Sequence, residues 1–256
     1  MIPDDVAYFC EPFVGGGGLT IPVLDRLPSG SRVYLNDIDP RVAAWWTAMS
    51  DRDDGGFSQL MWLLKIVTPT VESFYTIQKM GLDPHAHIPF RAFSGIFINR
   101  CSFSGALGAG PIGGREQLSR YTVDCRYNLP KLLQRHEEIR ELLLRHEVVV
   151  TSEDFRVVME RHPEAFMYVD PPYRGRANNV YPTAFDDADH EDLAALLMGR
   201  SAPWLLSHTD QPWLRERYAG CDFKMAKTYY TAASQRQERI VGHEVVVSRG
   251  IERLAL

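Results

Sequence analysis

The segment Tyr168-Val-Asp-Pro-Pro-Tyr173 has residue types suited to holding a planar amino group. The amino nitrogen of a nucleobase is a poor nucleophile because its lone pair is delocalised into the ring. Asp170 can accept one of its N–H groups and the carbonyl of Pro171 the other, while Pro171 and Pro172 fix the backbone so that both acceptors point the same way. The ring of Tyr173 offers a face for an extruded base, a contact worth roughly 1–3 kcal/mol. Asp170, Pro171, Pro172 and Tyr173 are therefore the candidate catalytic residues.

The position of this segment along the chain agrees with such a role. The apolar run at Ala165–Val169 predicts a buried strand, with Asp170 at its carboxyl end. Open α/β sheets place their ligand sites at these ends. The tetrapeptide alone also fits a strand that ends in a rigid proline turn, so a second group of residues is needed to choose between the two interpretations.

That second group is a strand, a glycine-rich turn and a helix near the amino terminus. Val6–Cys10 predicts the strand, Glu11-Pro-Phe-Val-Gly-Gly-Gly-Gly18 the turn and Leu19–Leu27 the helix. Arg32–Leu35 predicts the next strand, and Asn36-Asp-Ile-Asp39 follows it. An acid at such a strand end can accept both hydroxyls of a ribose.

The turn does not match the two common phosphate-binding patterns. It has no Gly-Lys-Ser/Thr, and Thr20 and Ile21 follow where the dinucleotide fingerprint would have its last glycine. The pattern therefore predicts a cofactor that has a ribose and no phosphates to cradle. S-adenosylmethionine meets this description.

Spaced motifs along nearly the whole chain resemble the Dam-like adenine-specific DNA methyltransferases. The four main ones, in order, are Glu11–Gly18, Asn36–Asp39, Ser152-Glu-Asp-Phe155 and Asp170–Tyr173. Asn99-Arg-Cys-Ser-Phe-Ser-Gly105 resembles the segment that precedes the DNA-contacting region of that family, with Ser104 in place of the usual Asn. Weaker matches follow at Tyr181, Phe185, His190, Leu193, Leu196, Leu197 and Leu205–Asp210.

The resemblance implies a site-specific adenine-N6 methyltransferase that flips its target base out of double-stranded DNA and takes the methyl group from S-adenosylmethionine. Asp37 would then bind the ribose, Ile38 would pack on the cofactor's adenine, Asp154 would accept its amino group and Phe155 would cover the ring. Taken singly, Asp37 also fits a solvated turn acid and Asp154 a helix N-cap. The residues that would bind the cofactor are Glu11, Pro12, Phe13, Gly15, Gly17, Asp37, Ile38, Asp154, Phe155 and Asp170. The residues that would bind DNA are Asn99, Arg100, Phe103, Ser104, Arg115, Arg120, Arg174 and Arg176.

The chain departs from the family at its start. Members of this family carry a Lys-Trp-Ala-Gly-Gly-Lys-like segment that grips the methionine carboxylate, whereas only Met1 to Asp5 precede the first predicted strand here. Three explanations fit: a start that omits the segment, another group that binds the carboxylate, or a chain that needs a partner chain or has lost turnover.

Composition agrees with one large α/β domain that carries an insertion. The chain has 256 residues, of which 45% are hydrophobic, and a net charge of −5. We expect a doubly wound Rossmann-like sheet formed by residues 1–50 and 146–256, with a mostly helical target-recognition region at 51–145. Pro40–Ser50 and Val71–Met80 are predicted helices, the first with Trp45 and Trp46 as core residues, and His85–Phe90 is a predicted connection. Trp204–Ser207 and Glu244–Ser248 are predicted strands. The overall acidity does not suit a protein that coats nucleic acid. Between Asn99 and Arg145, however, the sequence has eight Arg or Lys residues and only five acidic residues. This local excess of positive charge suits contact with DNA on one side of the protein.

Other classes of function are less well supported. The four cysteines are scattered and form no Cys-x-x-Cys pair, so we expect no metal site and reduced thiols in a cytoplasm. No apolar run approaches the roughly 20 residues that cross a bilayer, so we expect no membrane partner. Two alternatives to adenine-N6 transfer stay open: an amino-methyltransferase acting on cytosine N4 or on RNA, and a non-catalytic DNA-binding or partner subunit that has lost cofactor binding.

Overall fold

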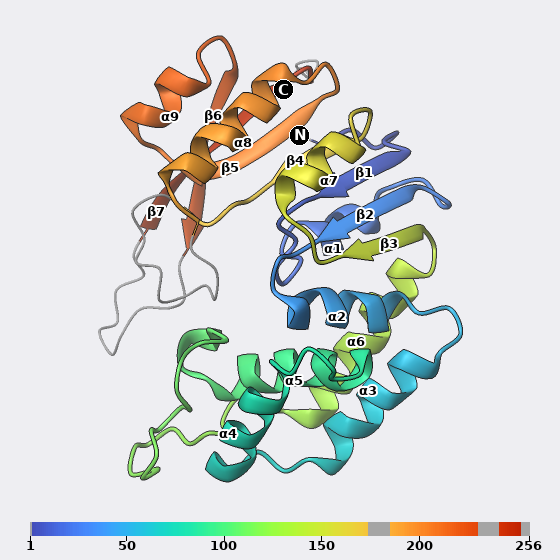
Figure 1. Ribbon diagram of the computed structural model, residues 1–256, viewed down its shortest axis with the longest axis vertical. Coiled ribbons are helices and arrows are strands. Elements are labelled where there is room, and N and C mark those ends of the chain that lie inside the picture. Colours follow the sequence, from blue (N-terminus) through green and yellow to red (C-terminus); the bar gives the residue numbers. More distant parts are fainter. Residues whose placement is uncertain (1, 174–184, 230–240, 252–256) are drawn as a thin grey trace.

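A mixed seven-stranded sheet forms the centre of the protein (Figure 1). The computed structural model describes residues 2–173, 185–229 and 241–251. The strands are β1 (Tyr8–Glu11), β2 (Arg32–Asn36), β3 (Glu147–Thr151), β4 (Phe166–Val169), β5 (Trp204–Thr209), β6 (Asp222–Tyr229) and β7 (Val241–Arg249), in the spatial order β3-β2-β1-β4-β5-β7-β6. Neighbouring strands from β3 to β5 are parallel, and β7 runs antiparallel between β5 and β6. The strand order reverses between β1 and β4, which is where open α/β sheets form a binding crevice.

Helices cover both faces of the sheet. The described helices are α1 (Thr20–Leu24), α2 (Pro40–Ser50), α3 (Gly55–Ile66), α4 (Val71–Met80), α5 (Ile88–Cys101), the 3₁₀ helix η1 (Phe103–Gly105), α6 (Leu129–Leu143), α7 (Phe155–Arg161), α8 (Asp187–Gly199) and α9 (Pro212–Arg217), of which α3, α4, α5 and η1 lie beyond α2 rather than on the sheet (Figure 1). Successive strand residues point to opposite faces: Phe9 joins the core shared with α1, α2 and α6, and Cys10 joins the core shared with α7, α8 and α9. The expected doubly wound α/β sheet is therefore confirmed.

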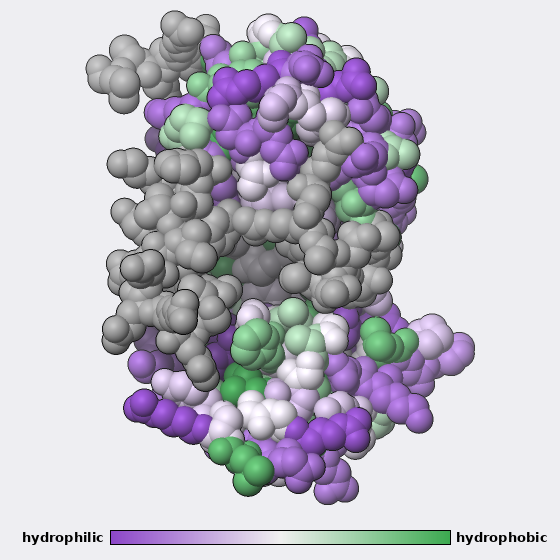
Figure 2. All heavy atoms as spheres, turned by 90° about the vertical axis from the view of Figure 1, so that its left-hand side faces the viewer, coloured by the Kyte–Doolittle hydropathy of each residue, from purple (hydrophilic) through white to green (hydrophobic). Residues whose placement is uncertain are grey.

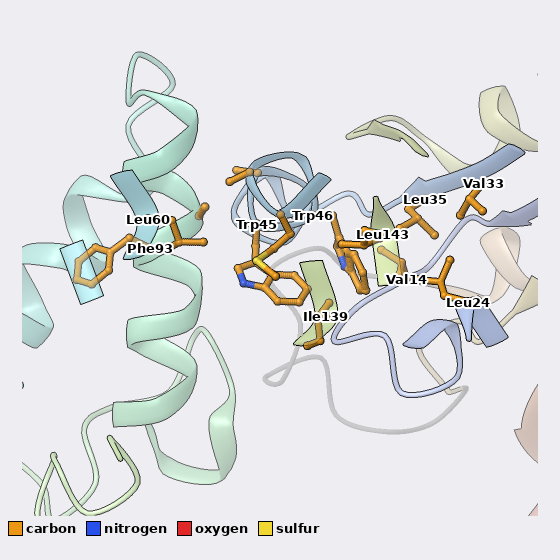
Figure 3. Close-up of a cluster of buried hydrophobic side chains, with 14 of the residues drawn as sticks. Val14, Leu24, Val33, Leu35, Trp45, Trp46, Leu60, Phe93, Ile139 and Leu143 are labelled. Carbon is orange, nitrogen blue, oxygen red and sulfur yellow. The ribbon is translucent and has the colours of Figure 1, made fainter. Parts of the chain in front are cut away.

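The helices between α2 and β3 share a continuous core with the sheet. Trp45 and Trp46 on α2 are buried, as predicted, and lie between the sheet and the helices α3 and α5, which contribute Leu60 and Phe93 (Figure 3). The Trp45 indole N–H donates to Nε2 of His136 on α6 (3.0 Å). The helical region is thus anchored to the sheet by packing, so its outer surface has a fixed position relative to the strand ends.

Several predicted elements have the expected bounds and others do not. Helices α2 and α4 begin and end at the predicted residues. The segment His85–Phe90 was expected to be a connection, but α5 already begins at Ile88, because Pro89 occupies the first turn, where proline is well accommodated. Strand β6 and helix α9 were not predicted.

Candidate active site

Three acids stand at the carboxyl ends of adjacent parallel strands. Glu11 ends β1, Asp37 follows β2 and Asp170 follows β4. The charges of Asp170 and Asp37 both contribute to raising the pKa of Glu11, so the three carboxylates lie within electrostatic reach of one another. The residues predicted for cofactor binding and for catalysis thus share one edge of the sheet, at the left of the sheet in Figure 1.

Asp37 is held against the glycine-rich turn by backbone amides. Its Oδ2 accepts from the N–H of Gly15 and its Oδ1 from the N–H of Asp39, both at 2.9 Å. Burial raises its pKa to about 6, although the two amides oppose this shift. A carboxylate has about four acceptor positions, so Asp37 can still accept two hydroxyl groups from a ligand.

Glu11 has an acceptor without a partner. Its side chain is buried, and its Oε2 has no hydrogen-bond partner among the described residues. Burial, together with Asp170 and Asp37, raises its pKa well above the ordinary value. A group bearing a positive charge or an N–H donor would satisfy this oxygen and favour its ionised form. The site therefore suits a ligand that presents hydroxyls to Asp37 and a cationic group to Glu11.

The glycine-rich turn is open on its ligand side and anchored on the other. A Cβ atom added at Gly15, Gly16 or Gly18 would meet nothing within 4 Å, so a ligand can approach the backbone closely. Gly17 has a φ of 69°, and a Cβ there would lie 2.4 Å from the ring of Trp46. The Trp46 indole N–H also donates to the carbonyl of Gly15 (2.9 Å). Trp46 thus fixes the turn, a role that its prediction as a core residue did not include.

Asn36 connects three segments of the site, which the sequence did not indicate. Its Nδ2 donates to the carbonyls of Pro12 (2.9 Å) and Glu153 (3.0 Å). Its Oδ1 accepts from Thr151 Oγ1 (2.8 Å) and the N–H of Glu153 (2.9 Å). These bonds join the segment that carries Phe13 to the segment that carries Asp154, at the ends of β1 and β3, the two neighbours of β2.

The remaining predicted cofactor residues lie around the same strand ends. Phe13 and Phe155 are in ring contact, with centroids 5.3 Å apart. The side chain of Ile38 is 47% exposed. Asp154 accepts from the N–H of Arg156 (2.9 Å) and caps α7, and it also pairs with the Arg156 guanidinium (3.1 Å). Asp154 is thus a helix N-cap, and its exposed carboxylate retains acceptor positions for a ligand.

Asp170 begins the proline turn after β4. Pro171 is buried, whereas Asp170 is exposed. The surrounding protein atoms still displace much of its hydration, and this desolvation raises the pKa of Asp170 to about 6, with a smaller contribution from the charge of Glu244. The nearby Tyr173 hydroxyl acts in the opposite direction and lowers the pKa of Asp170. Asp170 is therefore ionised at neutral pH and available as an acceptor.

The Tyr173 side chain is held by Glu244 and His208, for which the sequence indicated no such role. Its hydroxyl donates to Oε1 of Glu244 (3.1 Å), and its ring lies against His208, with centroids 5.1 Å apart. Burial raises the pKa of Tyr173, so the hydroxyl keeps its proton at neutral pH. Glu244 was predicted only as part of a strand.

The predicted DNA-binding residues of the helical region gather around the end of α5. Phe103 is 65% exposed, and Ser104 has a φ of 56°, in the left-handed region. The Asn99 amide donates to the carbonyl of Gly105 (2.9 Å), which fixes this turn. Burial lowers the pKa of Arg100, with a contribution from Arg126. The face in Figure 2 is hollowed between the sheet and the helical region, and apolar and charged side chains border the hollow on the helical side.

Arg115 and Arg120, the other two predicted DNA contacts in this region, are exposed beside aromatic rings. The guanidinium of Arg115 lies 4.9 Å from the ring centre of Tyr75, and that of Arg120 lies 5.6 Å from the ring centre of Tyr121. Arg174, Arg176 and Tyr181 lie outside the described residues. In the described part of the chain, no three His, Cys, Asp or Glu side chains are arranged to hold a metal ion. No described helix is long and apolar enough to span a membrane.

Two comparisons with known proteins agree with this geometry. A family model described as D12 class N6 adenine-specific DNA methyltransferase matches residues 1–236. The chain is also 22% identical, over 264 aligned residues, to the type II methyltransferase M1.LlaDCHI of Lactococcus lactis subsp. cremoris. That alignment covers 97% of this chain and 88% of the relative.

Proposed function

The chain belongs to the D12 class of N6 adenine-specific DNA methyltransferases, and on that basis we propose that it binds S-adenosylmethionine at Glu11 and Asp37 and methylates an adenine flipped out of double-stranded DNA against Asp170 and Tyr173. The observation that carries the proposal is the common edge shared by the three acids at the ends of β1, β2 and β4. The alternatives of cytosine-N4 or RNA methylation do not fit an adenine-specific DNA family.

The cofactor proposal is supported by the donors and acceptors that are present. S-adenosylmethionine, when bound, supplies a methyl group on a positively charged sulfonium. Asp37 would accept the ribose hydroxyls, and the unpartnered Oε2 of Glu11 would face the cationic amino acid part. Phe13, Phe155 and Ile38 would provide apolar contact for the adenine, with Asp154 accepting its amino group. Pro12, Gly15 and Gly17 would shape the turn that borders the methionine part.

Asp170 would act by orienting the amino group of the target adenine. Its carboxylate and the carbonyl of Pro171 would each accept one N–H, which localises the nitrogen lone pair toward the methyl group. As the nitrogen forms its bond to the methyl carbon, the bond from that carbon to the sulfonium sulfur would break and leave a neutral thioether. The nitrogen would gain positive charge, which the preorganised acceptors stabilise, and it would then release one proton to water. The ring of Tyr173 would stack on the base, and this contact offsets part of the few kcal/mol that unstacking costs. Pro171 and Pro172 would hold the acceptors in place.

We further propose that residues 51–145 recognise the DNA target. In this region Arg135, Arg140 and Arg145 form ion pairs with acids, so their charge is partly compensated. Arg115 and Arg120, which lie beside aromatic rings, are better suited to phosphate or base contact. Phe103 and Ser104 would reach the DNA from the end of α5, with Asn99 and Arg100 supporting them. Arg174 and Arg176, which follow Tyr173 in the sequence, would also contact the DNA.

The Asp170→Asn variant tests the catalytic assignment. The amide has nearly the same size as the carboxylate, but it loses acceptor capacity and charge. We expect methyl transfer to unmethylated genomic DNA, measured as N6-methyladenine by mass spectrometry of nucleosides, to fall by at least about a hundred-fold, as when a preorganised charge-stabilising group is removed. S-adenosylmethionine binding, measured by calorimetry, should persist.

Asp210→Asn is a matched control for this experiment. Asp210 follows β5 and pairs with Arg215 (2.8 Å), so its loss removes an ion pair near the same sheet edge without touching the proposed catalytic turn. Retained transfer in Asp170→Asn would refute the catalytic role. Absence of S-adenosylmethionine binding to the wild-type protein would refute the cofactor site and favour the non-catalytic subunit.

A further inference from the structure

The side chain of Tyr173 is held at its polar end and along its ring. The hydroxyl donates to Glu244 on β7, and the ring lies against His208 at the end of β5. His208 is buried and in ring contact with His190 and Trp213, so it forms part of a packed aromatic group behind Tyr173. The tyrosine that would receive the base is therefore supported by two strands that lie outside its own turn.

The sheet topology is what brings these two supports together. Strand β7 is antiparallel to β5, so residues near its start lie beside the carboxyl end of β5: Glu244 pairs with Thr209, and Val245 pairs with His208. Glu244 therefore stands at the same sheet edge as Asp170, although 74 positions separate the two in the sequence. At this register β7 presents the Glu244 carboxylate to the Tyr173 hydroxyl.

We propose that Glu244 is a positioning residue for methyl transfer, which holds the Tyr173 hydroxyl so that the tyrosine ring is fixed in the orientation that stacks on the extruded adenine. The inference rests on the proposed stacking role of Tyr173. A tyrosine with a free hydroxyl can turn about two side-chain bonds, whereas a base can stack only on a ring in one orientation. The hydrogen bond to Glu244 and the contact with His208 restrict this motion before the base arrives, so the Tyr173 side chain loses less conformational entropy when the base binds.

Glu244 does not need to touch the DNA for this role. Its carboxylate accepts from the Tyr173 hydroxyl, and its charge also raises the pKa of Asp170. A carboxylate is a stronger acceptor than a neutral group, so it competes well with water for the tyrosine proton. The hydrogen bond requires only an acceptor oxygen at position 244. Glutamine has a carbonyl oxygen of similar reach, so Glu244→Gln should preserve most of the positioning of the Tyr173 ring.

A double-mutant cycle tests the proposal on the full-length protein. The variants are Tyr173→Phe, Glu244→Ala, the two combined, and Glu244→Gln. The readout is kcat/KM for unmethylated genomic DNA with labelled S-adenosylmethionine, with cofactor affinity measured separately by calorimetry. We expect Tyr173→Phe and Glu244→Ala each to lower kcat/KM by about two- to ten-fold, the value of one immobilised side chain. The kcat/KM of the double variant should be no lower than that of the less active single variant, because both changes remove the same hydrogen bond. Cofactor affinity should not change, and Glu244→Gln should retain most of the activity.

Glu147→Ala is the matched control, since Glu147 is an exposed carboxylate at the start of β3, at the opposite end of the strands. Multiplied effects in the double variant would overturn the proposal, as would a Glu244→Gln variant as slow as Glu244→Ala. If Glu244→Ala does not fold, a comparison of Tyr173→Phe with Glu244→Gln still tests the proposal. A Tyr173→Phe variant that is as active as the wild type would show that the hydrogen bond from the Tyr173 hydroxyl to Glu244 does not matter for transfer. Failure of the proposed function itself would show differently, as an Asp170→Asn variant that still methylates DNA.

Discussion

Replacement of Asn36 should lower both the stability of the fold and the affinity for S-adenosylmethionine. The Asn36 side chain is 2% exposed and uses its four hydrogen-bonding positions on Pro12, Thr151 and Glu153. Asn36→Ala removes all four bonds. Asn36→Asp preserves the size but replaces the donating amide with an oxygen that faces the carbonyls of Pro12 and Glu153.

The expected magnitude follows from this bonding. A neutral hydrogen bond contributes about 1 kcal/mol net, and a buried group left without a partner costs about 1–3 kcal/mol. Thr151 is partly exposed and can turn its hydroxyl to water, so we count the three backbone partners and expect Asn36→Ala to lose about 3 kcal/mol. For a domain of this size that corresponds to a melting temperature lower by roughly 6–12 °C. Asn36→Asp should lose at least as much at neutral pH, because an ionised carboxylate would face two carbonyl oxygens.

Urea titration and thermal melting measure the stability, and calorimetry with S-adenosylmethionine measures the effect on the site. Asn128→Ala is a suitable control: the exposed Asn128 side chain accepts from the N–H of Lys131 and caps α6, so its loss should cost only about 1 kcal/mol. An Asn36→Asp variant that melts within about 2 °C of the wild type would refute the reasoning, because the bonds around Asn36 would then carry little of the stability.

Three further predictions concern single positions. Gly17→Ala should abolish S-adenosylmethionine binding in calorimetry, because a Cβ atom would lie 2.4 Å from the Trp46 ring at a positive φ. Ser104→Gly should raise the stability in urea by about 1 kcal/mol, since Ser104 has a left-handed φ of 56° that glycine adopts without cost. Cofactor affinity and kcat/KM should both fall as the pH drops through 6, because burial raises the pKa of Asp37 and of Asp170 to about 6 and both must be ionised; Asp37→Asn should flatten the affinity profile. For folding the sign is opposite: the raised pKa values mean that ionising these acids destabilises the fold as the pH rises from about 4 to 6.

The positions of the chemistry-bearing motifs were predictable because they follow strand ends. An apolar run followed by Asp-Pro-Pro-Tyr, and another followed by Asn-Asp-Ile-Asp, are local patterns, and parallel strands bring their carboxyl ends to one edge. The start of helix α2 was predictable for a similar reason, since Asp39 caps it and Pro40 suits the first turn.

The supporting residues were not predictable because their partners are distant in the sequence. Asn36 bonds to residues 115 and 117 positions away, and Glu244 meets Tyr173 only through the antiparallel register of β7. Strand β6 escaped prediction because it is the outer strand and contains Lys224 and Lys227, charges that edge strands carry but buried strands do not. The resemblance to the family likewise concerned the motifs and gave no information about these supports.

The distribution of charge explains why only the base of the DNA would enter the site. Glu11, Asp37 and Asp170 form an acidic edge, where burial and the charges of Asp170 and Asp37 make Glu11 harder to ionise, so a phosphate group would be repelled there. A cationic sulfonium and a neutral adenine meet no such repulsion, and both gain from acceptors that face them. Arg115 and Arg120 stand instead on the helical region, which is fixed to the sheet through the packed tryptophans of α2. The backbone of the DNA would therefore be held by one part of the molecule while the adenine is drawn out of the duplex toward the other.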